Sequence, residues 1–145
     1  FRSMSLKPCT VFTTGKESFE IADDEVEIGL GIHGEPGTHR EKMATANEFT
    51  EKLFEKVYAE SDVQKGDRFA VLVNGLGETT LIELFIVNNH LQDLLKDKGV
   101  EVAKTLVGNY MTSLDMGGFS ITLLKLDSEM EELLNAEEDT IAFWY

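Results

Sequence analysis

Hydrophobic positions along the chain follow two different periods, and each change of period marks a predicted element. In residues 26–33 every second side chain is apolar, which predicts a half-buried strand. In residues 38–59 apolar side chains recur every three or four positions, which predicts an amphipathic helix. The unbroken apolar run at residues 69–73 is typical of a strand covered on both faces. The first half therefore alternates strands with a helix.

The second half continues this alternation. A long helix is predicted over residues 81–98, with Thr79 or Thr80 as its N-cap and Gly99 as its stop. The other predicted elements are a β-rich run at 9–12, strands at 100–110 and 119–126, and an acidic helix at 128–136 capped by Ser128. Together they predict one compact α/β domain with a mixed, mostly parallel sheet flanked by helices. The last two strands are expected to pair antiparallel through their short link.

Composition narrows the range of partners. The chain of 145 residues has 13 Lys and Arg against 27 Asp and Glu, a formal net charge of −14. Such a surface repels phosphate backbones and anionic lipids, so neither nucleic acid nor a membrane is an expected partner. The single cysteine, Cys9, can form no internal disulfide, and no apolar run reaches the roughly 18 residues that span a bilayer. We expect a cytoplasmic protein.

The most suggestive segment for chemistry is the glycine-rich stretch around His33. Gly29 and Gly31 remove side chains from the strand face that carries His33, so a small ligand could approach the backbone beside the imidazole. Gly34 and Gly37 make the following turn tight and place the histidine at the end of a strand, where α/β folds hold their ligands. Gly31, His33 and Gly34 are therefore the candidate substrate-binding residues.

His33 is also the candidate catalytic residue. An imidazole with the usual pKa of about 6.5 is largely neutral near pH 7, and its ring nitrogen is then a nucleophile toward a carbonyl or phosphoryl group. Glu35 could orient the ring through its other nitrogen. The alternative is a glycine-rich turn whose histidine only hydrogen-bonds the backbone.

Known motifs for nucleotide and metal binding are incomplete in the same segment. The glycine pattern of residues 29–34 formally matches a dinucleotide-binding fingerprint, but Glu35 and Pro36 follow where a helix should open and where a phosphate-binding loop would need lysine. A zinc deaminase needs two further cysteines. His33 and His39 lack the helical spacing of a metal pair. We therefore expect no nucleotide site and no metal site here.

Residues 74–80 form a second predicted strand-to-helix turn. In a parallel sheet this turn would lie at the same edge as the His33 turn, so the two loops could face one pocket. Its amide groups could hold a polar ligand, although the carboxylate of Glu78 opposes an anion there. The alternative is a tight turn with a capping threonine. His39, in the first turn of a predicted helix, and His90 are expected to be solvated.

Three segments, in this order, carry a resemblance to a known family. They are residues 26–37 (VEIGLGIHGEPG), 73–77 (VNGLG) and 106–116 (LVGNYMTSLDM). Over nearly its whole length the chain resembles the C-terminal half of the substrate-binding subunit of dihydroxyacetone kinase. The resemblance implies that residues 1–145 are the C-terminal α/β subdomain of that subunit, and that the N-terminal half, with a general acid/base histidine and aspartate, is absent.

The resemblance also implies a role for His33. In this family the ring nitrogen of the matching histidine adds to the ketone of dihydroxyacetone and forms a covalent hemiaminal. The phosphoryl donor is expected on a separate nucleotide-binding kinase subunit, as ADP recharged by the phosphoenolpyruvate phosphotransferase system, or on a fused domain as ATP with Mg. No cofactor is then expected in this chain, and without the acid/base pair it should be a poor catalyst.

The chain departs from the family pattern at two places. Phe12 follows Val11 where a proline is usual, and residues 77–80 are Gly-Glu-Thr-Thr where Gly-Gly-Thr-Pro is usual. Some paralogues in the family are ligand-sensing coactivators of a transcription factor. Such a coactivator is the alternative function.

The C-terminal tail carries a cluster of aromatic residues. Residues 140–145 are too aromatic for a solvated tail, and they are expected to dock on the domain or on a partner. The partner would be the absent half or a second copy of the chain. A homodimer is therefore expected.

Overall fold

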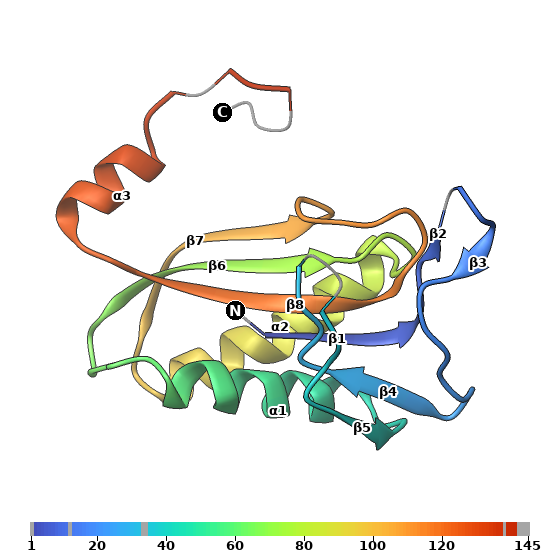
Figure 1. Ribbon diagram of the computed structural model, residues 1–145. Coiled ribbons are helices and arrows are strands. Elements are labelled where there is room, and N and C mark those ends of the chain that lie inside the picture. Colours follow the sequence, from blue (N-terminus) through green and yellow to red (C-terminus); the bar gives the residue numbers. More distant parts are fainter. Residues whose placement is uncertain (1, 12, 33–34, 138, 142–145) are drawn as a thin grey trace.

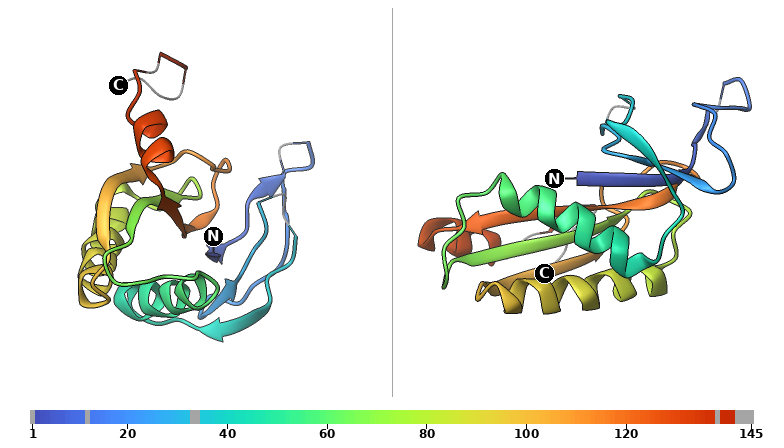
Figure 2. Two further views of the ribbon diagram at one scale, coloured as in Figure 1. Left: turned by 90° about the vertical axis from the view of Figure 1, so that its left-hand side faces the viewer. Right: turned by 90° about the horizontal axis from the view of Figure 1, so that it is seen from below.

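The computed structural model describes residues 2–11, 13–32, 35–137 and 139–141 (Figure 1). Its strands are β1 (Arg2–Lys7), β2 (Thr10–Val11), β3 (Lys16–Glu17), β4 (Glu25–Ile28), β5 (His39–Lys42), β6 (Arg68–Gly75), β7 (Glu101–Gly108) and β8 (Gly117–Leu126). Its helices are α1 (Ala46–Ala59), α2 (Leu81–Asp97) and α3 (Ser128–Leu134). Helices α1 and α2 lie side by side against one face of the large sheet, and α3 follows the end of β8 (Figure 2).

The large sheet has six strands in the order β5-β4-β1-β8-β6-β7, and β2 pairs with β3 in a separate ribbon. β6 and β7 are parallel and are joined by α2. The α/β class and the mixed sheet are thereby confirmed. The expectation of a mostly parallel sheet is wrong, because the other four neighbouring pairs of described strands run antiparallel.

Strand β8 lies in the middle of this sheet, so the prediction that it pairs with β7 is wrong. It aligns with β6 from Arg68↔Leu126 to Gly75↔Phe119, and β1 pairs along its other side. The link between β7 and β8 must therefore cross the end of β6. β1 is missing from the sequence-based prediction, although it supplies the second antiparallel partner that places β8 inside the sheet.

The first long helix begins later than its hydrophobic pattern predicts. Residues 39–42 form the edge strand β5, which pairs with β4 from Ile28↔His39 to Glu25↔Lys42. Opposite charges across this pair, such as Arg40 beside Glu27, favour the strand. Helix α1 begins only after Thr45, which is its N-cap.

Strand β4 ends at Ile28, five residues before the predicted strand end at 33. Gly29 adopts a φ of +84°, which breaks the extended backbone, and the N–H of Thr38 donates to the Ile28 carbonyl at 2.7 Å to close the hairpin. The alternation of side chains is lost beyond this point. Ile32 is consequently exposed, while Leu30 stays buried.

Several predicted elements are confirmed with small changes at their ends. The strand at 69–73 is the centre of β6, the helix at 81–98 is α2 with Thr80 as its N-cap, and the strand at 100–110 contains β7. The cap of α3 is Asp127 rather than Ser128, because the Asp127 carboxylate accepts the N–H of Met130 at 2.8 Å.

The aromatic tail lies mostly outside the part of the chain that the structure describes. Its residues 142–145 are not among the described ones, and neither is Phe12 of the β-rich run at 9–12. Ile141 is fully exposed. Docking of the tail stays a prediction.

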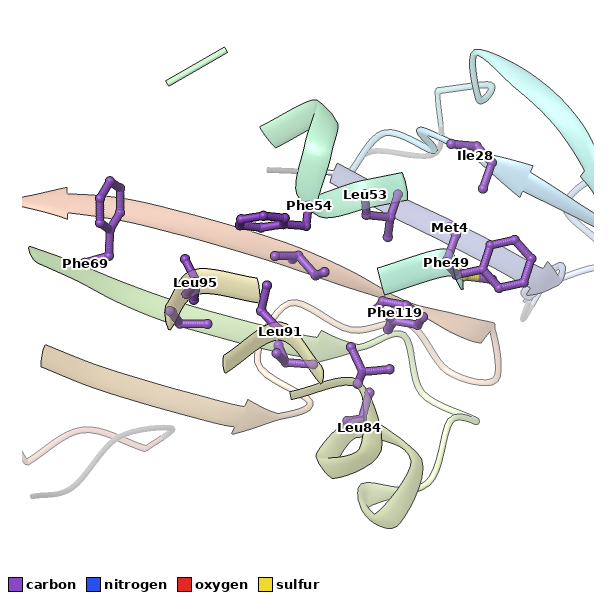
Figure 3. Packing of buried hydrophobic residues seen from close by; sticks show 14 of the residues in the cluster. Met4, Ile28, Phe49, Leu53, Phe54, Phe69, Leu84, Leu91, Leu95 and Phe119 are labelled. Atoms are coloured by element: carbon purple, nitrogen blue, oxygen red, sulfur yellow. The ribbon is translucent and has the colours of Figure 1, made fainter. Parts of the chain in front are cut away.

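The hydrophobic core lies between the sheet and the two long helices (Figure 3). The helices contribute Phe49, Leu53 and Phe54 from α1 and Leu84, Leu91 and Leu95 from α2. Large side chains from the sheet include Met4, Ile28, Phe69 and Phe119. The three-to-four-residue spacing within each helix is the one the sequence predicts. No described helix combines the length and the apolar character needed to span a bilayer.

A Thr45→Ala variant is expected to lose about 1 kcal/mol of unfolding free energy. The Thr45 hydroxyl accepts the N–H of Glu48 at 3.3 Å, and the Glu48 carboxylate accepts the N–H of Thr45 at 2.8 Å. Alanine removes the first of these bonds and loosens the second. Urea unfolding followed by far-UV circular dichroism measures the loss, and an unchanged midpoint would mean that α1 gains nothing from its cap.

Candidate functional site

An open depression of about 520 Å³ lies on the sheet face that points away from α1 and α2. Ser3 on β1 and Ser120 on β8 are direct cross-strand partners and form its floor. Strand side chains alternate between the two faces, and the neighbouring Met4 and Ile121 pack in the core against the helices. The floor is therefore polar and almost completely buried.

Three loops form the walls of this depression. Residues 30–32 come from the loop after β4, Leu76 from the loop after β6, and residues 110–113 from the link before β8. Cys9 and Ser18, on either side of the β2–β3 ribbon, also line it. Apolar side chains and hydroxyl groups are mixed in this lining, which suits a small compound that carries several hydroxyl groups.

The expectation that the two glycine-containing loops face one pocket is fulfilled, but not through a shared edge of a parallel sheet. Ile28 on β4 is level with Gly75 at the end of β6, through the cross-strand partners Met4 and Phe119. β4 is short, and it pairs with β1 only from Met4 onward. Its C-terminal end therefore lies level with the C-terminal end of β6, although the two strands run in opposite directions. The loops therefore meet over Ser120.

Of the three candidate substrate-binding residues, Gly31 lies in the wall of the depression. His33 and Gly34 lie outside the described residues, and their roles stay predictions. Gly31 does not provide the open space that the sequence suggests, because a Cβ there would collide with the carboxyl group of Glu35. The missing side chain at position 31 leaves room for Glu35 rather than for a ligand.

Hydrogen bonds fix the backbone on both sides of Gly31. The N–H of Gly29 donates to the Ser3 carbonyl at 2.7 Å, and the Ser3 hydroxyl donates to the Leu30 carbonyl. The N–H of Gly31 donates to the Glu35 carbonyl at 3.0 Å. The loop after β4 is thus attached to the floor of the depression at its start and closed on itself at its tip.

Asn74 holds the opposite wall, a role that the sequence-based prediction does not give it. Its Oδ1 accepts the N–H groups of Tyr110 and Met111, both at 2.8 Å. Its Nδ2 donates to the Met111 carbonyl at 2.7 Å and lies 3.4 Å from the Ser120 hydroxyl. Asn74 is only 1% exposed, so these bonds are shielded from water. One side chain therefore determines where residues 110–111 lie.

The turn at 74–80 is closed on the start of β8 and is not an open cradle for a ligand. The N–H of Glu78 donates to the Met116 carbonyl at 3.1 Å, and the Thr79 hydroxyl both donates to and accepts from the backbone of Gly118. Glu78 forms an ion pair with Lys7 at 2.9 Å. The geometry favours the alternative of a tight turn with a capping threonine.

Asp115 ties the segment after β1 to the link before β8. Its carboxylate accepts the hydroxyl of Thr10 at 2.5 Å and the N–H of Thr10 at 2.7 Å. These hydrogen bonds, the hydroxyl first, hold the pKa of the Asp115 carboxyl below its ordinary value. The neighbouring Cys9, which lines the depression, also hydrogen-bonds to the Asp115 carboxylate.

The Asp115 tether is expected to be lost in acid. Because the folded pKa lies below the unfolded value of about 3.9, the contact stabilises the fold above that pH and is lost as pH falls through the folded pKa. At pH 7 an Asp115→Ala variant should let a maleimide label Cys9 about threefold faster or more, since alanine removes the acceptor of both Thr10 donors. Equal labelling rates in the variant and the parent would contradict the tether.

The other two histidines contact glutamate carboxylates. His39 lies on β5 rather than in a helix, with Nδ1 2.9 Å from the Thr38 hydroxyl and Nε2 2.8 Å from Glu41. His90 on α2 contacts Glu51 on α1 at 2.8 Å. Neither residue lines the depression.

The chain belongs to the Dak1 domain family, whose pattern matches residues 2–142. It is 48% identical over 141 residues to the dihydroxyacetone-binding subunit DhaK of PTS-dependent dihydroxyacetone kinase 1 from Listeria innocua, and the match covers 97% of this chain and 43% of that one. It is 40% identical over 146 residues to human triokinase/FMN cyclase, covering 97% of this chain and 25% of the human protein. The resemblance inferred from the three motifs is thereby confirmed.

Solved structures with the same fold extend this result. The dihydroxyacetone kinase operon co-activator Dha-DhaQ superposes with a TM-score of 0.86 at 38% identity, covering 94% of this chain and 42% of that one. The dihydroxyacetone kinase of C. freundii, in complex with AMP-PNP and Mg²⁺, superposes with a TM-score of 0.78 at 27% identity, covering 99% and 26%. The chain spans less than half the length of the relatives that it matches.

Proposed function

We propose that this chain is the part of a dihydroxyacetone kinase that binds the substrate, and that His33 holds dihydroxyacetone as a covalent hemiaminal. The observation that carries the proposal is the match to dihydroxyacetone-binding subunits along 97% of the chain. The depression supports the proposal, because Ile32, the residue before His33 in the sequence, is one of its lining residues.

The proposed step forms one bond and needs no co-reactant. A lone pair on the neutral imidazole attacks the ketone carbon, and the carbonyl double bond becomes a single bond to oxygen. That oxygen takes a proton, and the other ring nitrogen loses one, so the adduct contains every atom of the substrate. A terminal hydroxyl of the bound sugar is then the acceptor of the phosphoryl group.

The covalent bond accounts for selectivity. Glycerol has the hydroxyl groups of dihydroxyacetone but no carbonyl carbon, so it cannot form the hemiaminal. Hydroxyl contacts to the polar floor, where Ser3 and Ser120 lie, add to the recognition. Small hydroxylated ketones and aldehydes are the substrate class that this chemistry accepts.

The rest of the machinery is proposed to lie outside these residues. The phosphoryl donor, ADP or ATP with Mg, belongs to a separate nucleotide-binding kinase subunit or domain, and the general acid/base pair belongs to an N-terminal half of which residues 1–145 are the C-terminal counterpart. A homodimer is part of the same proposal. Support comes from the C. freundii kinase, whose structure contains AMP-PNP and Mg²⁺ in a chain about four times as long.

Intact mass spectrometry after incubation with dihydroxyacetone, without borohydride, is expected to detect an adduct of one whole sugar. Histidine-directed NMR should show a shift of one ring nitrogen. A His33→Ala variant should lose both signals, whereas His90→Gln, which changes a histidine at a surface ion pair, should keep them. No adduct and no ring shift in the parent protein would rule out the covalent anchor.

A coactivator that senses dihydroxyacetone is the second candidate function. The observation in its favour is the TM-score of 0.86 with the operon co-activator Dha-DhaQ. Phosphorylation of dihydroxyacetone separates the two when the form that includes the proposed N-terminal half is mixed with its nucleotide-binding subunit, since a kinase subunit supports turnover and a coactivator does not.

A further inference from the structure

The loop that contains His33 joins β4 to β5, and a buried carboxylate is one of the groups that close its neck. Glu27 lies on β4, one residue before the end of the strand, and is 7% exposed. Its Oε1 accepts the N–H of Gly37 at 2.6 Å. Gly37 lies on the returning half of the loop, so this side chain joins the chain before His33 to the chain after it, beside the bond from the Thr38 N–H to the Ile28 carbonyl.

The neck admits no bulkier residue at the point of contact. A Cβ on Gly37 would lie 2.5 Å from Cγ of Glu27 and 2.6 Å from the Ile28 carbonyl oxygen. The backbone therefore passes directly against the Glu27 side chain. This close approach keeps the Glu27 carboxylate within hydrogen-bonding distance of the Gly37 N–H.

A positive charge sits on the other side of the same carboxylate. Arg40 is the cross-strand partner of Glu27, and its Nε lies 3.4 Å from Oε2. Glu27 also borders a hollow of about 280 Å³, which Leu30 and Pro36 from the two halves of the loop line as well. The carboxylate thus contacts or borders both halves of the loop and the strand beyond it.

We propose that Glu27 is a positioning residue for His33, because it fixes the neck of the loop that contains this residue. The inference rests on the proposed function of His33 for its catalytic meaning. It predicts that the reach of the side chain to Gly37 matters more than its charge, since the hydrogen bond to the Gly37 N–H is short, at 2.6 Å, and the contact to Arg40 is long, at 3.4 Å.

Three variants separate reach from charge. Glu27→Gln keeps the length and an acceptor oxygen but not the charge, Glu27→Asp keeps the charge but is one methylene too short for Gly37, and Glu27→Ala removes both. The dissociation constant of the dihydroxyacetone adduct is expected to rise about tenfold or more in the Asp and Ala variants, since a small displacement of a reacting group has this effect. It should stay within about threefold in the Gln variant.

A control variant separates the role of Glu27 from a general loss of stability, and a second measurement tests that role without the adduct. Thr50→Ala removes another buried side-chain hydrogen bond, the one to the Ala46 carbonyl inside α1, and should leave the adduct unchanged. In the ligand-free protein the imidazole resonances of His33 should move in the Asp and Ala variants but not in Gln, while those of His90 stay fixed as an internal reference.

The possible outcomes are distinct. If the parent protein forms no adduct, the proposed function fails, and the imidazole resonances of His33 still decide the role of Glu27. If the Ala variant does not fold, the Asp and Gln variants give the same comparison. Unchanged His33 resonances in the Asp variant, or a Gln variant as defective as Asp, would overturn the positioning role.

Discussion

A Gly118→Ala variant is expected to lose about 3 kcal/mol of unfolding free energy or more. Gly118 has a φ of +146°, and an added Cβ would collide with the carbonyl oxygen of Met4 and lie 2.9 Å from Cα of Ser5. These atoms belong to β1, which pairs with β8 at this point. Because backbone cannot move aside as a flexible side chain can, the two central strands would have to separate.

Gly66→Ala is the matched control for this prediction. Gly66 also has a positive φ, of +88°, but an added Cβ would meet nothing within 4 Å. Its alanine variant should lose only roughly 1 kcal/mol of unfolding free energy, which is the cost of holding a residue with a Cβ at a positive φ. Urea unfolding of both variants measures the difference, and equal losses would show that the approach of β1 to β8 is not the cause.

The second large effect is expected at Asn74. An Asn74→Ala variant leaves the N–H groups of Tyr110 and Met111 and the Met111 carbonyl without their partner. Since each buried polar group that loses its partner costs about 1–3 kcal/mol, the unfolding free energy should fall by about 3 kcal/mol. The wall formed by residues 110–113 should move, and binding of dihydroxyacetone should weaken with it.

Asn74→Asp tests which half of the amide matters. Aspartate keeps an acceptor for the two N–H groups but loses the donor to the Met111 carbonyl, so its loss of stability should lie between the parent and the alanine variant. Denaturant unfolding and the amide resonances of Met111 and Ser113 report the two effects. An Asn74→Ala variant as stable as the parent would mean that residues 110–113 keep their position without the hydrogen bonds of Asn74.

Elements whose signals are local could be predicted from the sequence. Helix α2 combines a hydrophobic stripe with Thr80 before it and Gly99 after it, so both ends are marked in the chain itself. Helix α1 has the same stripe, but its predicted start was placed at residue 38 because Met43 fits the helical period. The competing interaction is the cross-strand pairing of residues 39–42 with β4, which involves residues far outside any helical window.

The order of the strands could not be predicted in this way. β8 lies between β6 and β1 because of two long pairings, and the nearer neighbour in sequence, β7, is excluded by β6. β1 did carry a signal, since buried Met4 alternates with Ser3 and Ser5, which point to the other face. Small polar residues such as serine are typical of loops, so they indicate a strand only when it is known that both faces of the sheet are covered.

The sequence predicts a candidate site from its glycines and its histidine, but it does not predict the residues that support the neighbouring loops. Asn74 directly follows the apolar run of β6, and a buried amide at a strand end is a recognisable signal for a clamp on a nearby loop. Glu27 sits inside an apolar alternation and reads as the solvated half of a strand. Only the returning loop at Gly37 explains why that carboxylate is buried.

The bond between the His33 imidazole and the ketone carbon is tested most directly by NMR with both atoms labelled. The protein, enriched with nitrogen-15 in its histidines, is mixed with dihydroxyacetone that carries carbon-13 at its central carbon. A tetrahedral carbon signal with a one-bond coupling to a ring nitrogen, absent in His33→Ala, is the expected result. A central carbon that remains a ketone or its hydrate, with no coupling to any histidine, would contradict the covalent anchor.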